Sequence, residues 1–88
     1  MDNRDLQQIR KRLRFRSWHR GTKEMDILLG NFADRHLAEF TPVQLDRYDA
    51  LLQNSDPDLY GWITGRESIP EAQDHDVMGL LQRFRIKT

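Results

Sequence analysis

The sequence has no cysteine, and this absence excludes several kinds of site at once. Disulfide frameworks, thiolate zinc sites, iron–sulfur clusters and cysteine nucleophiles all need residues that this 88-residue chain lacks. Long hydrophobic runs are also missing, since no apolar run exceeds three residues whereas a membrane span needs roughly 20. Near the N-terminus there is no apolar segment of a secretory signal. These absences favour a cytoplasmic protein that does not enter a membrane.

Net charge is zero, yet the charges of the two signs are separated along the chain. Residues 1–23 hold eight basic residues against two acidic ones, a surplus of six. Residues 24–88 hold six basic residues against twelve acidic ones, a deficit of the same size. Such an asymmetry influences the approach of partners more than it influences the fold. The length corresponds to one domain, so we expect residues 1–88 to form a single helical domain.

Apolar residues recur at intervals of three and four, which is typical of amphipathic helices. The clearest stripe consists of Met25, Leu28, Leu29, Phe32 and Ala33. The pattern predicts an all-α fold, a compact bundle of about five short helices. The expected helices run from about 5 to about 18, from Thr22 to about Leu37, from Pro42 to about Gln53, from Pro57 to just before Gly65, and onward from Asp74. Residues 66–73 are expected to form a loop.

Local signals at the helix ends support these boundaries. The segment Thr41-Pro42-Val43-Gln44 predicts a capping box with proline at the first helical position. Asp56, followed by Pro57, is expected to cap the fourth helix, and Asp74 is expected to cap the fifth. Gly30 lies inside the second predicted helix, where a glycine is tolerated if another helix packs closely against it.

The sequence offers no constellation that catalysis would need. The three histidines, His19, His36 and His75, never have the i, i+4 spacing that places two metal ligands on one helical face. The serines stand in no nucleophile-elbow pattern, and no glycine-rich phosphate loop ends in Lys-Ser or Lys-Thr. We therefore expect a protein that is not an enzyme, has no metal site and binds no cofactor tightly.

The first predicted helix carries a run of basic residues, Arg10, Lys11, Arg12, Arg14 and Arg16. One interpretation is contact with the phosphates of nucleic acid or of a membrane surface. The other is a solvated helix face whose arginine stems cover apolar surface. Phe15 and Trp18 could stack on bases, but they fall near the expected inward face, so core packing explains them as well. The acidic remainder of the chain favours the second interpretation, and no nucleic-acid or membrane partner is expected.

The segment Arg20-Gly21-Thr22-Lys23-Glu24 joins the first two predicted helices. Gly21 permits a tight joint or the close approach of another backbone, and Thr22 is expected to cap the second helix. Arg20 and Glu24 are four residues apart, which allows them to pair with each other. Alternatively they form a recognition patch, in which the planar fork of the arginine binds a carboxylate or phosphate. From the residues alone, the helix start with an Arg20–Glu24 pair is the preferred interpretation.

Three segments of the chain form a combined signature. The first is Arg20-Gly21-x-x-Glu24, and the second runs from Glu24 to Leu29 and is followed by Phe32. The third is Asp56-Pro57-x-Leu59-x-x-Trp62. Together they lie within about Phe15–Ile63 and resemble the SdhE-type FAD assembly factor family, the succinate dehydrogenase assembly factors or flavinators.

The resemblance implies an all-helical protein that binds the flavoprotein subunit of succinate dehydrogenase, or in bacteria that of fumarate reductase. Family members promote the covalent attachment of FAD to a histidine of that subunit, in a reaction that is autocatalytic in the flavoprotein. The factor acts as a scaffold, so FAD is contacted only transiently, through the partner, and we expect a monomer. Some members are described as antitoxin-like, so the alternative is a nucleic-acid-binding or antitoxin-like regulatory protein that uses the basic first helix.

Carried over by position, the partner-binding patch would consist of Arg20, Gly21 and Glu24, with Asp26, His19 and Arg16 beside it. His19 stands where many members have a second basic residue, so the resemblance implies a weaker or pH-dependent contact in that part of the interface. Eukaryotic members carry mitochondrial presequences, whereas the first helix here is expected to begin at about residue 5. This leaves no room for a presequence and implies a bacterial cytoplasmic protein.

Overall fold

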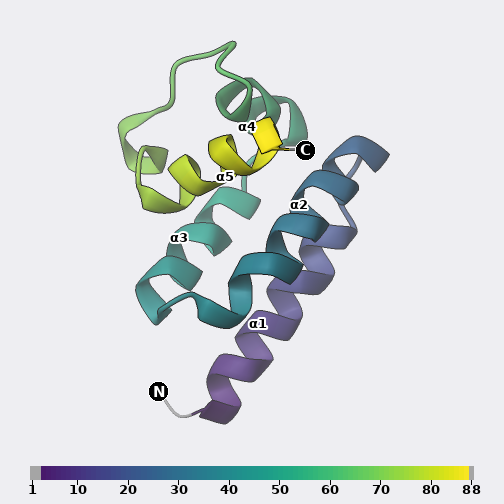
Figure 1. Ribbon diagram of the computed structural model, residues 1–88, viewed down its shortest axis with the longest axis vertical. Coiled ribbons are helices and arrows are strands. Elements are labelled where there is room, and N and C mark those ends of the chain that lie inside the picture. The colour runs from purple at the N-terminus through teal and green to yellow at the C-terminus, as the bar shows by residue number, and fades with distance from the viewer. Residues whose placement is uncertain (1–2, 88) are drawn as a thin grey trace.

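The computed structural model describes the backbone of residues 3–87 and the side chains of residues 3–84. Over this range the chain forms five α-helices and two short 3₁₀ helices without a strand, which confirms the predicted all-α class (Figure 1). The predicted loop over 66–73 includes one of the 3₁₀ turns. In chain order the elements are α1 (Asn3–Trp18), α2 (Lys23–His36), η1 (Leu37–Glu39), α3 (Pro42–Leu52), α4 (Asp56–Ile63), η2 (Glu71–Gln73) and α5 (Asp76–Lys87).

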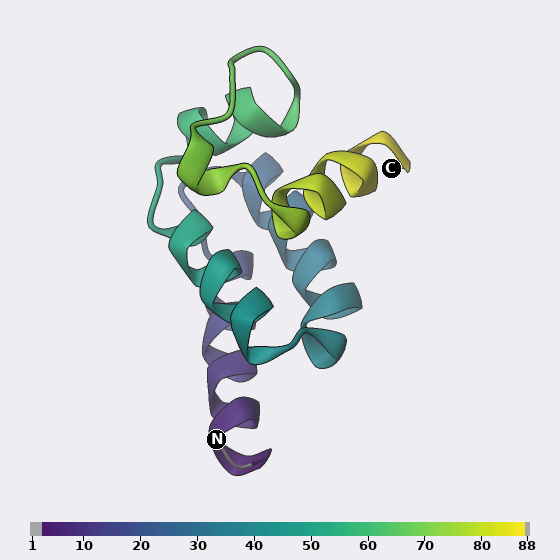
Figure 2. The same ribbon diagram turned by 90° about the vertical axis from the view of Figure 1, so that its left-hand side faces the viewer.

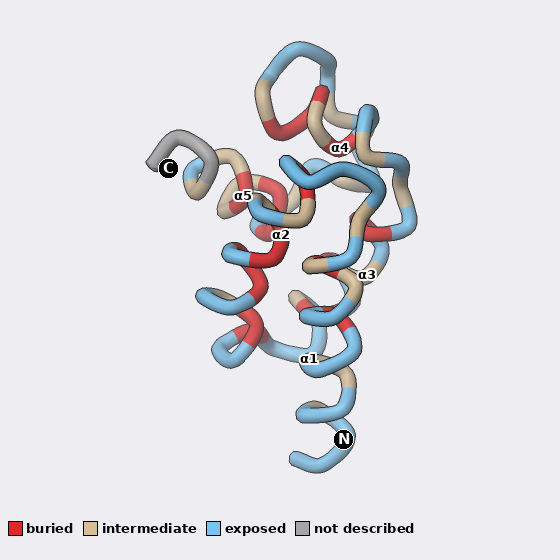
Figure 3. The backbone as a smooth tube through the Cα atoms, turned by 90° about the vertical axis from the view of Figure 1, so that its right-hand side faces the viewer, coloured by how far each residue is buried: buried red, intermediate tan, exposed pale blue. Residues whose placement is uncertain are grey.

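The first two helices form an antiparallel hairpin against which the other helices pack. α1 and α2 lie side by side, and α3 packs against α1, while α5 lies against α2, α3 and α4 (Figures 1 and 2). The first turns of α1 project beyond the rest of the molecule and are exposed (Figure 3). The joint between α1 and α2 is therefore at the opposite end of the hairpin, close to α4.

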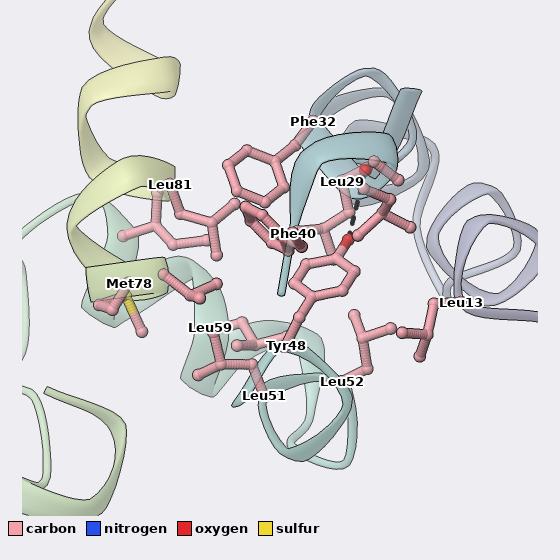
Figure 4. Packing of buried hydrophobic residues seen from close by; sticks show 14 of the residues in the cluster. Leu13, Leu29, Phe32, Phe40, Tyr48, Leu51, Leu52, Leu59, Met78 and Leu81 are labelled. Atoms are coloured by element: carbon pink, nitrogen blue, oxygen red, sulfur yellow. Dashed lines mark hydrogen bonds between the residues drawn. The ribbon is translucent and has the colours of Figure 1, made fainter. Parts of the chain in front are cut away.

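Aromatic rings from α2, α3 and the segment between them form the centre of the core (Figure 4). The ring of Phe32 lies 5.5 Å from that of Tyr48 and 6.0 Å from that of Phe40, centroid to centroid. The hydroxyl of Tyr48 lies 2.6 Å from Oγ of Ser17 and 3.4 Å from the carbonyl oxygen of Leu29. Burial raises the pKa of Tyr48 far above its usual range, so its hydroxyl stays protonated and joins α1, α2 and α3 by neutral hydrogen bonds.

Two of the predicted helix caps are confirmed. The hydroxyl of Thr22 accepts a hydrogen bond from the backbone N–H of Met25 at 3.3 Å and caps α2. At the start of α3, Thr41 and Gln44 form the reciprocal capping box, with N–H to oxygen distances of 3.0 and 3.2 Å. Gly65 takes a positive φ of 78° just after α4, as its expected place at the end of that helix requires.

The other two predicted caps were wrong. Ser55, not Asp56, caps α4, because its hydroxyl accepts from the backbone N–H of Asp58, while the carboxylate of Asp56 bonds to the α1–α2 joint. Ahead of α5, His75 rather than Asp74 takes the capping role, since its Nδ1 accepts from the backbone N–H of Met78 at 3.3 Å. In both cases the side chain of the residue next to the predicted cap accepts a hydrogen bond from a free backbone N–H at the start of the helix.

At Gly30, α2 packs closely against the side chain of Trp18 from α1. A Cβ at this position would lie 2.2 Å from Cδ2 of Trp18, so only glycine leaves room for the indole, as predicted for a closely packed helix. The expectation that Phe15 faces inward was wrong, because its side chain is 63% exposed. Trp18 takes the contact with α2, and Phe15 points away from both neighbouring helices and stacks on His19 with centroids 4.0 Å apart.

Replacing Gly30 by alanine should destabilise the protein by about 1–3 kcal/mol, because the new methyl group overlaps the centre of the Trp18 ring. The matched control is Gly79→Ala on α5, where a Cβ would be in ordinary contact with Arg83 at 3.5 Å. This substitution should stabilise the protein by about 0.5–1 kcal/mol. Urea unfolding of both variants measures the difference, and an equal gain in stability from both would show that the indole does not occupy this space.

Stability should also fall in mild acid because of His75. Burial, helped by the nearby Arg47, lowers the pKa of His75, so the folded protein binds this proton more weakly than the unfolded chain. The stability that neutral His75 contributes is therefore lost as the pH falls from about 6.5 through the lower folded pKa. His75→Asn keeps a capping oxygen at every pH. Its melting temperature should change less than that of the wild type between about pH 7.5 and about pH 5, and identical pH profiles would contradict this account.

Candidate partner-binding surface

The side chain of Arg20 binds a segment of its own chain that is more than 30 residues away in the sequence. Its Nε donates to Oδ1 of Asp56 at 2.9 Å, and its two terminal nitrogens donate to the carbonyl oxygens of Leu52 at 2.8 Å and Asn54 at 2.7 Å. The side chains of Arg20 and Asp56 are only 12% and 11% exposed. The guanidinium therefore ties the end of α1 to the joint between α3 and α4, and it does not pair with Glu24.

The second carboxylate oxygen of Asp56 holds the backbone of the α1–α2 joint. It accepts hydrogen bonds from the backbone N–H groups of Gly21 at 3.0 Å and Thr22 at 3.2 Å. A Cβ on Gly21 would lie 3.3 Å from this oxygen. The group that comes close to Gly21 therefore belongs to the same chain. On the other side, the carboxylate of Asp26 accepts from the backbone N–H of Arg20. The joint is thus fixed by two carboxylates and three backbone amides.

The remaining predicted site residues differ in what they offer to a partner. Glu24 is exposed in the first turn of α2, and His19 is exposed beside Phe15, whose carbonyl oxygen lies 2.7 Å from its Nδ1. Arg16 is half-buried and forms an ion pair with Asp49 of α3 at 2.6 Å. The structure therefore brings the predicted residues to one end of the molecule, but Arg16, Arg20 and Asp26 bind other parts of the same chain.

The exposed residues at this end form what we call the seam surface, which consists of His19, Gly21, Thr22, Lys23, Glu24 and Pro57 together with the half-buried Tyr60. Two hollows lie in it. One, of about 470 Å³, is lined by residues 19–22 with Asp56 and Pro57. The other, which we call the tyrosine hollow, has about 370 Å³ and is lined by residues 22–25 with Asp56, Pro57 and Tyr60. Both hollows are lined in part by Thr22, Asp56 and Pro57, so they are adjacent.

Sequence reasoning missed Asp56 as the partner of Arg20, and it missed Tyr60 altogether. The signal for Asp56 was the joint appearance of the Arg-Gly and Asp-Pro segments in the family resemblance. Because the two segments are 36 residues apart, nothing in the local pattern shows that they touch.

The basic face of α1 is largely used inside the molecule. Arg10 donates to the carbonyl oxygens of Leu37 at 2.7 Å and Phe40 at 3.0 Å. Arg14 pairs with Asp34 of α2 at 3.3 Å, in addition to the pair between Arg16 and α3. Lys11 and Arg12 are exposed. A solvated face therefore describes only part of the run, and the arginines that bind their own chain offer no support for phosphate binding.

No three His, Asp or Glu side chains in the part of the chain that the structure describes are grouped so that they could hold a metal ion. None of the described helices combines the length and the apolar character that crossing a membrane needs.

Replacing Arg20 by alanine should destabilise the protein by about 3–5 kcal/mol, because it leaves Asp56 buried without its cation and two carbonyl oxygens without donors. Arg14→Ala is the matched control, since it breaks an ion pair whose side chains are 44% and 49% exposed. That pair should contribute less than about 1 kcal/mol. Chemical denaturation checks both values, and equal losses would mean that the Arg20 network does not hold the two joints together.

This chain is similar to several proteins that are named as assembly factors. It is 38% identical over 78 residues to succinate dehydrogenase assembly factor 2, mitochondrial, of Dictyostelium discoideum, covering 89% of this chain and 55% of that protein. The protein of the same name from Kluyveromyces lactis is 41% identical over 83 residues, covering 90% and 51%. FAD assembly factor SdhE of Acetobacter pasteurianus is 42% identical over 62 residues, covering 70% and 57%.

These relatives correct one expectation and confirm another. The expected bacterial cytoplasmic location was wrong, because the relatives from D. discoideum and K. lactis are named as mitochondrial proteins. The chain spans about half the length of such relatives, so the residues before its first helix carry no conclusion about location. The family described as flavinator of succinate dehydrogenase matches residues 11–85, and the chain belongs to this family, as the resemblance indicated.

Proposed function

We propose that this protein is an assembly factor that binds the flavoprotein subunit of succinate dehydrogenase and promotes the covalent attachment of FAD to it. The observation that carries the proposal is the family match over residues 11–85, which includes both joints of the seam surface. The same surface could serve the related subunit of fumarate reductase. The proposed protein acts as a monomeric scaffold and not as an enzyme.

We propose a division of roles among the site residues. Arg20 and Asp26 position the joint from within, since their polar groups bind Asp56 and the local backbone. Gly21, Glu24 and His19 then contact the partner, because they are exposed on the fixed joint, and Arg16 supports its edge through Asp49. A recognition surface that is already rigid loses little conformational entropy on binding, which favours tight association.

The residues of the seam surface do not fit a resident FAD. A dinucleotide diphosphate needs a glycine-rich turn at a helix start or free cationic donors. Arg20 is nearly buried and has its donors committed to Asp56, Leu52 and Asn54, and the amides of Gly21 and Thr22 already bind Asp56. Lys23 is a single exposed cation next to Glu24, so it does not by itself form a diphosphate site. We therefore propose that this protein contacts FAD only through the flavoprotein subunit, to which the flavin becomes covalently attached.

Covalent flavin on the flavoprotein subunit tests the proposal. The subunit is expressed with the wild-type chain, without it, and with Glu24→Arg, then denatured, and its retained flavin fluorescence is measured. Glu24 is exposed and outside the Arg20 network, so its reversal should leave the fold intact and lower the fluorescence about tenfold, as for an interface hot spot.

The matched control is Glu39→Arg, which makes the same exchange on an exposed residue of η1, just after the far end of α2. It should leave the fluorescence unchanged. Arg20→Ala is a poor probe for this purpose, because loss of function through unfolding would look the same as loss of binding. Equal fluorescence in all samples, including the one without the chain, would exclude a role in flavinylation.

A further inference from the structure

The tyrosine hollow lies beside the Arg-Gly-x-x-Glu motif and needs an explanation of its own. Met25, which is 2% exposed, lies at its base, and Pro57 and Tyr60 of α4 contribute apolar walls. A methionine at the base of a pocket adapts its shape to an incoming group. A volume of about 370 Å³ is at the lower end of the range for small-molecule sites, so it suits one or two side chains.

The ring of Tyr60 is held in place from outside the hollow. The guanidinium carbon of Arg66 lies 5.6 Å from the centroid of the ring, in a cation–π contact. The chain following α4 turns back over this helix, and the backbone N–H of Glu67 donates to the carbonyl oxygen of Gly61 at 3.1 Å. A Cβ on Gly61 would lie 2.9 Å from the carboxylate of Glu67, so the contact is close. The aromatic wall is therefore formed before a partner arrives.

The charges around the hollow disfavour an ionic occupant. Lys23 and Glu24 line it with opposite charges, and neither has an ion pair or side-chain hydrogen bond among the described residues. The carboxylate of Asp56, although it also lines the hollow, is neutralised by Arg20 and accepts from two backbone amides. A phosphate or a carboxylate would meet as much repulsion as attraction, whereas an apolar group needs no compensating charge.

We propose that the tyrosine hollow receives an apolar side chain from an exposed segment of the flavoprotein subunit. The inference rests on the proposed function, because the occupant belongs to the same partner. The hollow is adjacent to the one above Gly21, because Thr22, Asp56 and Pro57 line both, so one partner surface covers both. Tyrosine at the centre of an interface, packed against an apolar group, is the kind of residue that dominates binding energy.

Calorimetric titration of the isolated flavoprotein subunit with the wild type and four variants tests the inference. Tyr60→Ala removes the wall and should weaken binding at least about tenfold, whereas Tyr60→Phe keeps the ring and should bind within about twofold of the wild type. Lys23→Trp places an indole at the mouth of the hollow from an exposed position, so it should also weaken binding about tenfold without disturbing the core. Lys11→Trp, the same exchange on an exposed residue of α1, is its control and should bind like the wild type.

The outcomes separate this inference from the proposed function. If the wild type binds and both Tyr60→Ala and Lys23→Trp bind equally well, the inference is overturned while the assembly role stands. If the wild type does not bind at all, both fail. An apolar contact also predicts that the loss caused by Tyr60→Ala is the same at about 0.1 M and about 0.5 M NaCl. A loss that disappears at the higher salt concentration would mean that the occupant is ionic.

Discussion

The pairing of Arg20 with Asp56 is the interaction on which the arrangement of the molecule depends. It connects the end of the α1–α2 hairpin to the start of α4, and both partners are nearly buried. All of its polar groups are satisfied, by the carbonyl oxygens of Leu52 and Asn54 on one side and by the amides of Gly21 and Thr22 on the other. A buried ion pair is favourable only under such conditions, since each uncompensated group would cost several kcal/mol.

This network makes two distant segments of sequence into one structural unit. The Arg-Gly pair supplies the cation and the amide, and the Asp-Pro pair supplies the carboxylate that binds both. In this arrangement Arg20 fixes a surface that other residues present, so the loss of Arg20 removes the surface together with the fold. An effect of its mutation on function would therefore not show that it touches a partner.

Sequence reasoning succeeded where the determinants are local. The apolar stripe of α2 and the caps at Thr22 and Thr41 depend on residues within one helical turn, and the structure has them as predicted. It failed where a distant residue decides the outcome. Asp56 does not cap α4 because Arg20 and the amides beside it bind its carboxylate, and Phe15 is exposed because Trp18 fills the space at Gly30. Neither competitor can be identified before the helices are placed in space.

The separation of charge along the sequence has its explanation in the same contacts. Three arginines of the basic segment, Arg14, Arg16 and Arg20, form ion pairs with aspartates of α2, α3 and α4. The basic residues 1–23 and the acidic residues 24–88 are thus largely complementary in charge. Their excess charges hold helices together more than they attract partners. What remains for recognition is the surface that the fold does not use. At the seam this surface includes a glycine, a preformed aromatic wall, and a lysine and a glutamate that have no ion pair among the described residues, which together suit a protein partner better than a polyanion.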